Sequence, residues 1–557
     1  MPHIYHLYFV ALTLCSASAG VRSVLFFFED DGGFAIGAYG DKKIATPHLD
    51  ALASRGTTFD NAYTSVSSCS PSRASLLSGV PTHQSGQFGL VNANFYSYSG
   101  IQSLPTILNN AGHGNTSLDI KTGIIGKYHV WSAGAQGNAY NFSWGNSPTG
   151  PGGCFSGASI ACPGTDYNFV SRNITNMRNG ADQFFEWAGD AGFFLYMGFG
   201  DSHRCGGAIG EFCEQYGIDQ TTNKSTIPDW TPFVISPSQV QLPFWIQDTP
   251  IARTDYAHMY TAKNRMDQGI GLILTALESS GRANDTLIIY TADNGAPFAA
   301  GKTNFYNPGM GEPLIISKPG GAEGVRTSVL ASELDLMPTI LDWLGITAPV
   351  YNLNGIDVVL QGRSLISLLD QGSLANQGKD TPEVVHTQVM TAMEMEKRVS
   401  VLAALRPSTS APLSLPASYT TVFGSFQWHE QQMYFPMRVV VASDDATGAP
   451  TFRYKLIYNI AHLLPYPLSS DLWGAPAFVD LEQRTKSGEE TFWYRNFTIY
   501  LAPRAQWELF DLISDPQELS NIASDPAFSS ILSSLSADIK AWQLATNDDW
   551  MIKYEHE

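Results

Sequence analysis

Long apolar runs and basic side chains are both scarce in this 557-residue chain. The apolar stretch from Tyr5 to Cys15 is too short to cross a bilayer, and no later stretch is long and apolar enough to do so. Lys and Arg number 32 against 51 Asp and Glu, which leaves a formal net charge of −19. The sequence therefore predicts no membrane span, and so acidic a chain gives no basis for a nucleic-acid partner.

Cysteine is scarce too, with six residues in the whole chain. Cys15 belongs to the apolar stretch, and the small residues Ser16 to Ala19 that follow it are typical of a signal-peptide cleavage site. We therefore predict a signal peptide over residues 1–19 and passage through the secretory pathway to a lysosomal or extracellular destination. Glycosylation sequons agree with that route and begin at Asn115, Asn141, Asn173, Asn223, Asn284 and Asn496.

Once Cys15 and Cys69 are set aside, the remaining cysteines form two local pairs. These are Cys154 with Cys162 and Cys205 with Cys213. In an oxidising compartment such pairs predict short-range disulfides. A metal site is the alternative, but no histidine cluster accompanies the pairs at zinc spacing.

Over residues 20–371, apolar strand-like runs alternate with helical patterns, which predicts a mainly parallel sheet covered by helices on both faces. Val24 to Phe28 is continuously apolar, as a doubly covered strand should be. Residues 372–418 are rich in Gln, Ser, Thr and Pro and are predicted to be an irregular insertion or linker. Residues 419–557 are predicted to form a smaller α+β domain, with an antiparallel sheet and a final helix from Asp525 to Leu544.

Chemically capable residues follow the strands of the predicted α/β domain, at the carboxyl ends where open α/β sheets place their sites. Asp, Asn and Gly are common in ordinary turns. Lys and His are not turn formers, so their presence at these ends predicts a functional site. The residues in question are Asp30, Asp31, Lys127, His129, His203, Asp293 and Asn294.

An all-oxygen ligand set lies among them, formed by Asp30, Asp31, Asp293 and Asn294 from two strand ends. Separately, each could be a helix cap or a turn residue. Together, adjacent carboxylates demand a cation, and hard oxygen ligands suit Ca²⁺ or Mg²⁺. The sequence therefore predicts one divalent cation at this edge of the sheet.

Residues Cys69 to Gly79 read Cys-Ser-Pro-Ser-Arg-Ala-Ser-Leu-Leu-Ser-Gly and match every defined position of the sulfatase signature. The chain thus resembles the sulfatase family, although a buried thiol or a disulfide half is the ordinary interpretation of a cysteine in a secreted protein. In that family this cysteine is oxidised to formylglycine, and its hydrate offers two hydroxyls. One attacks sulfur, and the other later expels the sulfate. The resemblance implies that a formylglycine-generating partner acts on Cys69 during maturation.

The resemblance also implies an alkaline-phosphatase-like fold and roles for the site residues. Ca²⁺ would be held at the four oxygen ligands, with an oxygen of the modified Cys69 completing the shell. Lys127 and Lys302 would hold sulfate oxygens, Arg73 would fix the aldehyde hydrate, His129 would act as base and His203 as acid for the leaving group. A core or surface histidine, and for Lys302 a solvated loop lysine, are the alternatives.

Within the family, the resemblance is strongest to the sulfamidase branch, the heparan N-sulfatases. Besides the signature, the similar blocks are Asp30 to Phe34, Ile44 to Ala53, Thr122 to Lys127, His203 to Cys205, Ile227 to Pro232, Arg265 to Gly269 and Val422 to Ser425. Two departures are Gly200, where relatives often have histidine, and Lys302, where they have arginine and hence a forked donor set. His429 and Glu430 are candidates for the rim of the pocket.

The branch implies hydrolysis of the N-sulfate of N-sulfoglucosamine at the non-reducing end of heparan sulfate or heparin. An acidic surface repels a long polyanion, so a chain end or a small sulfated sugar is the expected partner. An O-sulfatase, a phosphohydrolase of the same superfamily and a non-catalytic glycan-binding protein are the alternatives, although Cys69 argues against the phosphohydrolase, which normally uses Ser or Thr. A homodimer stays open.

Overall fold

The computed structural model describes residues 21–111, 119–133, 139–146, 167–205, 211–353, 355–370, 420–444, 450–489, 500 and 503–553. The predicted signal peptide, the segment 372–418, Cys154, Cys162, Asn115 and Asn496 lie outside these ranges. Cys205 and Cys213 form a disulfide, as predicted. Among the described helices, none has both the length and the apolar character that a bilayer crossing requires.

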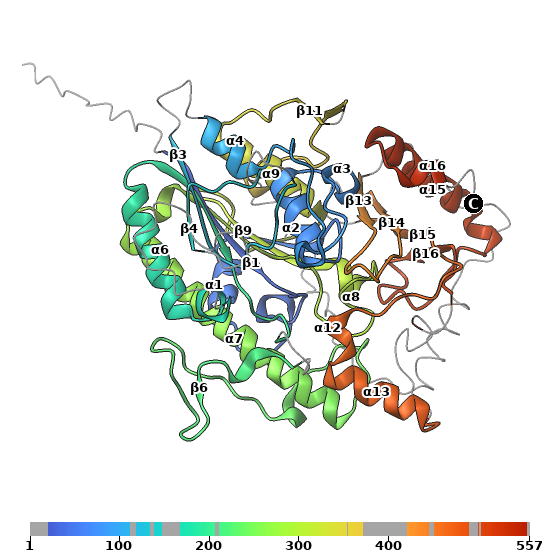
Figure 1. Ribbon diagram of the computed structural model, residues 1–557, viewed down its shortest axis with the longest axis horizontal. Coiled ribbons are helices and arrows are strands. Elements are labelled where there is room, and N and C mark those ends of the chain that lie inside the picture. The colour runs from blue at the N-terminus through green and yellow to red at the C-terminus, as the bar shows by residue number, and fades with distance from the viewer. Residues whose placement is uncertain are drawn as a thin grey trace, which may run out of the picture.

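An eight-stranded sheet forms the centre of the molecule (Figure 1), and its strand order is β10-β2-β9-β8-β1-β5-β3-β4. All neighbouring strands are parallel except that β9 runs antiparallel to both β2 and β8. The prediction of a mainly parallel sheet is confirmed. The strands are β1 (Ser23–Glu29), β2 (Thr57–Tyr63), β3 (Ile120–Gly126), β4 (Trp144–Asn146), β5 (Gly192–Gly198), β8 (Thr286–Ala292), β9 (Gly311–Ser317) and β10 (Val325–Ser332).

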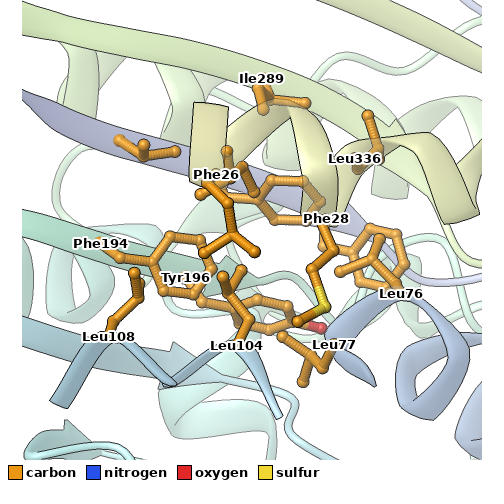
Figure 2. Close-up of a cluster of buried hydrophobic side chains, with 14 of the residues drawn as sticks. Phe26, Phe28, Leu76, Leu77, Leu104, Leu108, Phe194, Tyr196, Ile289 and Leu336 are labelled. Atoms are coloured by element: carbon orange, nitrogen blue, oxygen red, sulfur yellow. The ribbon is translucent and has the colours of Figure 1, made fainter. Parts of the chain in front are cut away.

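Both faces of this sheet are buried, because alternate residues of β1 enter different cores. Phe26 and Phe28 pack with Leu76 and Leu104 on one face, and Figure 2 shows this cluster. Phe27 points to the opposite face of the sheet and packs against a second set of helices. The first set is α2 (Cys69–Ser78), α4 (Leu104–Ala111) and α9 (Leu336–Leu344), and the second is α1 (Pro47–Ser54), α6 (Ile174–Ala188) and α7 (Pro250–Ser279).

A second, four-stranded antiparallel sheet has the order β13-β14-β15-β16. One face packs against α15, which begins at Ser529 after a short turn of 3₁₀ helix. The other face packs on Tyr63, Phe305 and Tyr306 beside the large sheet. The strands are β13 (Thr420–Phe426), β14 (Met437–Ser443), β15 (Arg453–Asn459) and β16 (Trp507–Asp511), and α15 is Ser529–Ala545.

The shorter elements connect these layers. One of them, α12, follows β15 of the second sheet in sequence and carries Asp471. The next helix, α13, lies beside the start of α7 (Figure 1), where the backbone amide of Ala477 donates a hydrogen bond to Asp255. Among the described residues, the remaining α-helices and strands are α3 (Thr82–Ser85), α5 (Tyr167–Ser171), α8 (Asn307–Met310), α10 (Ile366–Leu369), α12 (Ser470–Trp473), α13 (Pro476–Lys486), α16 (Trp550–Lys553), β6 (Ile218–Asp219), β7 (Lys224–Ser225), β11 (Tyr351–Leu353) and β12 (Ile356–Val358).

Candidate active site

The predicted strand ends meet because β8, β1, β5 and β3 are consecutive neighbours in the sheet and run in the same direction. Their carboxyl ends deliver the acidic, amide and basic residues that the sequence singled out. The N-terminus of α2 adds Cys69 to the same place, since Cys69 Sγ lies 3.5 Å from Asp30 Oδ1 and 3.7 Å from Asp31 Oδ1. Residues far apart in the chain therefore form one buried cluster.

Asp30 and Asp31 each form an ion pair with a different lysine in this cluster. Lys127 Nζ lies 2.5 and 2.6 Å from the two oxygens of Asp30, and Lys302 Nζ lies 2.9 Å from Asp31 Oδ1. Burial opposes ionisation of Asp30, but the surrounding positive groups, Lys127 foremost, together outweigh it and hold the pKa of this carboxyl well below its usual range. Both lysines are buried, so the solvated-loop alternative for Lys302 does not apply.

Asp293 and Asn294 support Asp31 from the adjacent strand end. Asp293 Oδ1 accepts from the Asp31 amide at 2.9 Å, and Asn294 Nδ2 donates to Asp31 Oδ1 at 2.8 Å. Asn294 Oδ1 is buried and has no hydrogen-bond partner among the described residues. A buried, unsatisfied amide oxygen beside carboxylates is a ligand that a hard cation would use.

The donor set therefore fits a divalent cation, in agreement with the sequence prediction. Ligand atoms of Asp30, Asp31, Cys69 and His203 lie within 4.8 Å of one another. His203 was predicted as an acid and not as a ligand. Asp293 is turned mainly toward Arg73, with its Oδ2 2.9 Å from Arg73 Nε.

Arg73 links the signature helix to the carboxylates. It is fully buried, its Nη2 lies 2.7 Å from Asp293 Oδ2, and its Nη1 donates to the Tyr196 hydroxyl at 2.9 Å. The same guanidinium contacts Asp30 at 3.3 Å. Two guanidinium nitrogens thus contact the same oxygen of Asp293, and together with the other bonds of Arg73 they fix the orientation of α2, and with it Cys69.

Cys69 itself is buried and reduced. Burial raises the pKa of this thiol well above its usual value, and Asp293 and Asp30 add to the effect against Lys127 and Lys302. An unmodified Cys69 would thus be a protonated thiol. That state is unsuited to nucleophilic attack, because the thiolate is the reactive form.

His129 and His203 face the same space from β3 and β5. Burial lowers the pKa of His129 well below its usual value, and Lys127 adds to this, so the imidazole is neutral and suited to accept a proton. His203 Nδ1 lies 2.6 Å from the Arg204 carbonyl, which can only accept, so Nδ1 carries a proton, and Nε2, which points to the site, carries one only in the imidazolium form. Burial lowers the pKa of His203, so the imidazolium forms at acidic pH. Both Asp31 and His129 have positive φ, at 57° and 55°, a strain that is typical of functional positions.

These residues open into a cavity of about 500 Å³. Its base is cationic, whereas Glu430 and Asp471 bring negative charge to its wall. Its lining consists of Cys69, Leu90, Asn92, Lys127, His129, Arg172, His203, Arg204, Cys205, Cys213, Lys302, Glu430, Ser470 and Asp471. The volume suits a sugar-sized anion.

Sequence reasoning missed Asp471, which lies on a four-residue helix. It also placed His429 at the rim, whereas the structure buries this histidine between Ser68 and Asp471, at 2.8 Å from Ser68 Oγ and 3.0 Å from Asp471 Oδ2. An isolated Asp in a short polar helix carries no periodic or motif signal. Only its contacts with residues from other elements reveal it.

A family model described as Sulfatase matches residues 22–346. Among curated proteins, the chain is 38% identical over 550 residues to N-sulphoglucosamine sulphohydrolase of Homo sapiens, which covers 97% of this chain and 93% of that protein. Among solved structures, a 2-O glycosaminoglycan sulfatase aligns with a TM-score of 0.54 at 19% identity, covering 95% of this chain and 93% of its own. A protein in complex with its substrate D-glucosamine-2-N,6-O-disulfate aligns with a TM-score of 0.56 at 17% identity, covering 95% and 99%. The last two likenesses concern the fold.

Proposed function

This chain belongs to the sulfatase family, and from that premise we propose that it hydrolyses the N-sulfate of N-sulfoglucosamine at the non-reducing end of heparan sulfate or heparin fragments. The observation that carries the proposal is the 38% identity to the human N-sulphoglucosamine sulphohydrolase over 97% of this chain. The match extends through the region that supplies Glu430 and Asp471 to the cavity. The products are inorganic sulfate and the free amine.

We further propose that Cys69 is converted to formylglycine by a dedicated enzyme during maturation. Its position at the N-terminus of α2, between two aspartates, supports this, as does a thiol pKa that leaves the unmodified residue unreactive. Arg73 would hold one oxygen of the modified side chain. His129, neutral because it is buried, would take a proton from it.

One Ca²⁺ is the proposed metal, held by Asp30, Asp31, Asp293, Asn294 and the modified Cys69. When bound, the ion would neutralise charge that develops on the sulfate oxygens. Lys127 and Lys302 would hold the remaining sulfate oxygens from the cationic base of the cavity. In its imidazolium form, His203 would donate its Nε2 proton to the leaving nitrogen, because an amine leaves readily only when protonated.

The site residues therefore have complementary roles: positively charged groups would bind the sulfate, His129 would accept a proton and His203 would donate one. We expect activity to be greatest on the acidic side of neutrality, where the amine leaves as its protonated form. A secretory route fits the Cys205–Cys213 disulfide, and of the two proposed destinations, lysosomal or extracellular, the lysosome fits this pH.

Sulfate release from matched N-sulfated and O-sulfated glucosamine oligosaccharides tests the assignment. We expect the N-sulfated set to be turned over with at least tenfold greater kcat/KM. A preference for the O-sulfated set would replace the proposed substrate while leaving the family membership intact. Mass analysis of the Cys69 peptide from active enzyme tests the modification, and a wholly unmodified thiol would contradict it.

A further inference from the structure

Asp471 is a carboxylate in the wall of a cavity that is built to bind an anion, and this placement requires an explanation. The residue lies on α12, and its side chain is 14% exposed. Burial opposes its ionisation, but Lys302 and His429 hold the pKa of this carboxyl well below its usual range. The wall therefore carries a fixed negative charge that would weaken sulfate binding if it had no other task.

The two oxygens of Asp471 have different surroundings. Oδ2 lies 2.8 Å from Lys302 Nζ and 3.0 Å from His429 Nε2, and His429 in turn is 2.8 Å from Ser68 Oγ. Ser68 directly precedes Cys69 and α2. This buried chain ties α12 to the helix that carries Cys69, so the position of Asp471 is fixed relative to the reacting centre.

Oδ1 has no hydrogen-bond partner among the described residues and lies 3.7 Å from His203 Nε2. That separation is too long for a hydrogen bond. It does allow a single atom to lie within hydrogen-bonding distance of both Oδ1 and Nε2. Because Nε2 is the proposed proton donor to the leaving group, the shared position is that of the leaving atom.

We propose that Asp471 is the specificity-determining residue that selects a nitrogen leaving group, an inference that rests on the proposed function. A sulfamate nitrogen carries a hydrogen that Asp471 Oδ1 can accept, whereas the bridging oxygen of a sulfate ester offers only lone pairs, which a carboxylate repels. During the reaction sulfur bonds to the oxygen nucleophile on residue 69, the S–N bond breaks and its electron pair stays on nitrogen. That nitrogen takes the Nε2 proton of the His203 imidazolium, which becomes neutral and keeps its proton on Nδ1.

The amine product also accounts for the negative charge of Asp471. At acidic pH the released amine takes up a further proton from water and becomes an ammonium ion. Asp471 Oδ1 then faces a cation, and a hydrogen bond between charged groups is stronger than one between neutral groups. An alcohol product would gain nothing comparable.

The test compares wild type with Asp471→Asn, which keeps the shape and removes the charge. Glu430→Gln is the matched control, since Glu430 lines the same cavity but bonds to Ser470 and Gln432 instead of Lys302 or His203. The readout is the ratio of kcat/KM for N-sulfated over O-sulfated glucosamine. We expect Asp471→Asn to lower this ratio about tenfold or more and Glu430→Gln to leave it close to the wild-type ratio.

An equal loss on both substrates in Asp471→Asn would mean that the residue only positions Lys302, and would overturn the inference while the proposed function stands. An equal fall of the ratio in Glu430→Gln would reduce the effect to general charge and also overturn it. If wild type prefers the O-sulfated substrate, both the proposed function and the inference fail.

A second measurement uses wild-type enzyme and does not depend on the folding of a variant. Glucosamine and N-acetylglucosamine are compared as inhibitors at acidic pH, because only the first carries an ammonium group. We expect glucosamine to inhibit wild type at least tenfold more strongly. Equal inhibition of wild type by the two sugars would overturn the inference whatever the substrate preference.

Discussion

The surroundings of Cys69 disfavour the thiolate, which is the reactive form of a cysteine. It is buried, protonated and placed against two aspartates, which would repel a thiolate. The same surroundings suit an oxygen-bearing side chain that faces a cation and several proton donors. The environment of the residue thus favours the modified form over the encoded one.

Replacing this residue by Cys69→Ser should abolish multiple turnover. A serine can accept the sulfuryl group once, but it has no second oxygen with which to expel it. We expect a fall of more than a hundredfold in steady-state rate, with mass spectrometry showing a sulfated serine at position 69 after incubation with substrate. Near-normal steady-state turnover in this variant would rule out the proposed mechanism.

The orphan oxygen of Asn294 makes the proposed metal site testable at a single residue. Asn294→Ala removes both the unpartnered Oδ1 and the hydrogen bond from Nδ2 to Asp31, so we expect stoichiometric Ca²⁺ to be lost and activity to fall at least tenfold. Elemental analysis of purified protein is the measurement, with thermal unfolding with and without added Ca²⁺ as a second readout. Wild type should be stabilised by Ca²⁺, since an ion bound only to the folded state adds about 2.7 kcal/mol at a hundred times its Kd.

Active protein without stoichiometric Ca²⁺ or Mg²⁺ would refute the metal site. Asn304→Ala is the control, because Asn304 is buried near the site but donates to the Lys302 carbonyl and accepts from Arg504. Its Ca²⁺ content should match that of wild type.

At the scale of elements, strands β3 and β5 end so close together that only glycine fits. A Cβ on Gly126 would lie 2.0 Å from the Gly198 carbonyl oxygen, and its φ is +92°. The Lys127 amide donates to that same carbonyl at 2.7 Å. This close crossing places Lys127 beside Asp30.

Gly126→Ala should therefore destabilise the protein by about 3 kcal/mol or more and displace Lys127 from the site. Gly345→Ala is the matched control: its φ is +71°, but nothing lies within 4 Å of the new Cβ. The control should cost only the left-handed backbone strain, about 1 to 2 kcal/mol, and keep full activity. Urea unfolding and sulfate release distinguish the two, and equal effects would show that backbone strain and not the carbonyl contact is responsible.

The contact between α3 and α15 contains a buried histidine. His83 Nε2 lies 2.7 Å from Thr546 Oγ1, and burial lowers the pKa of His83 to about 3. The unfolded chain has a histidine pKa near 6.5, so it binds a proton at pH 5 that the folded protein does not. The stability contributed by neutral His83 is present above about pH 6.5 and is lost as the pH falls toward 3.

By this linkage, His83 accounts for about 2 kcal/mol of the stability lost between pH 7 and pH 5. His83→Gln keeps a polar group near Thr546 and does not titrate. We expect the difference between urea unfolding free energies at the two pH values to be about 2 kcal/mol smaller in this variant than in wild type. An unchanged difference would show that His83 can be protonated in the folded state.

At the scale of the whole molecule, the net charge of −19 opposes a polyanionic substrate, while the base of the cavity attracts its sulfate end. Long-range repulsion is screened when the Debye length contracts from about 30 Å at 0.01 M salt to about 8 Å at 0.15 M. Contacts inside the cavity are short and screened much less.

We therefore expect added salt to lower KM for long heparan chains relative to KM for N-sulfoglucosamine monosaccharide. The ratio of the two KM values at 0.01 M and 0.15 M salt is the measurement. A constant ratio would mean that the acidic surface lies away from the approach of the substrate. An increase with salt would indicate a basic binding surface for the chain.

Much of this site could be read from the chain before its fold was known. The signature around Cys69 is local, and so are the polar ends of β1, β3, β5 and β8, because a strand and the residue that follows it are neighbours in sequence. Parallel strands bring such ends to one edge, so Asp30, Lys127, His203 and Asp293 could be predicted to meet. The mainly parallel sheet followed from the same alternation of elements.

Asp471 and the burial of His429 could not be read in this way. Lys302 and Asp471 are joined across 169 positions, through a four-residue helix that has no hydrophobic period and no motif. Their meeting depends on how the second sheet packs on Tyr63, Phe305 and Tyr306, which is a matter of side-chain shape over long range. Local sequence pattern was sufficient to predict the residues proposed to bind the sulfate. Asp471, which is proposed to face the leaving atom, reaches the site only through packing between distant parts of the chain.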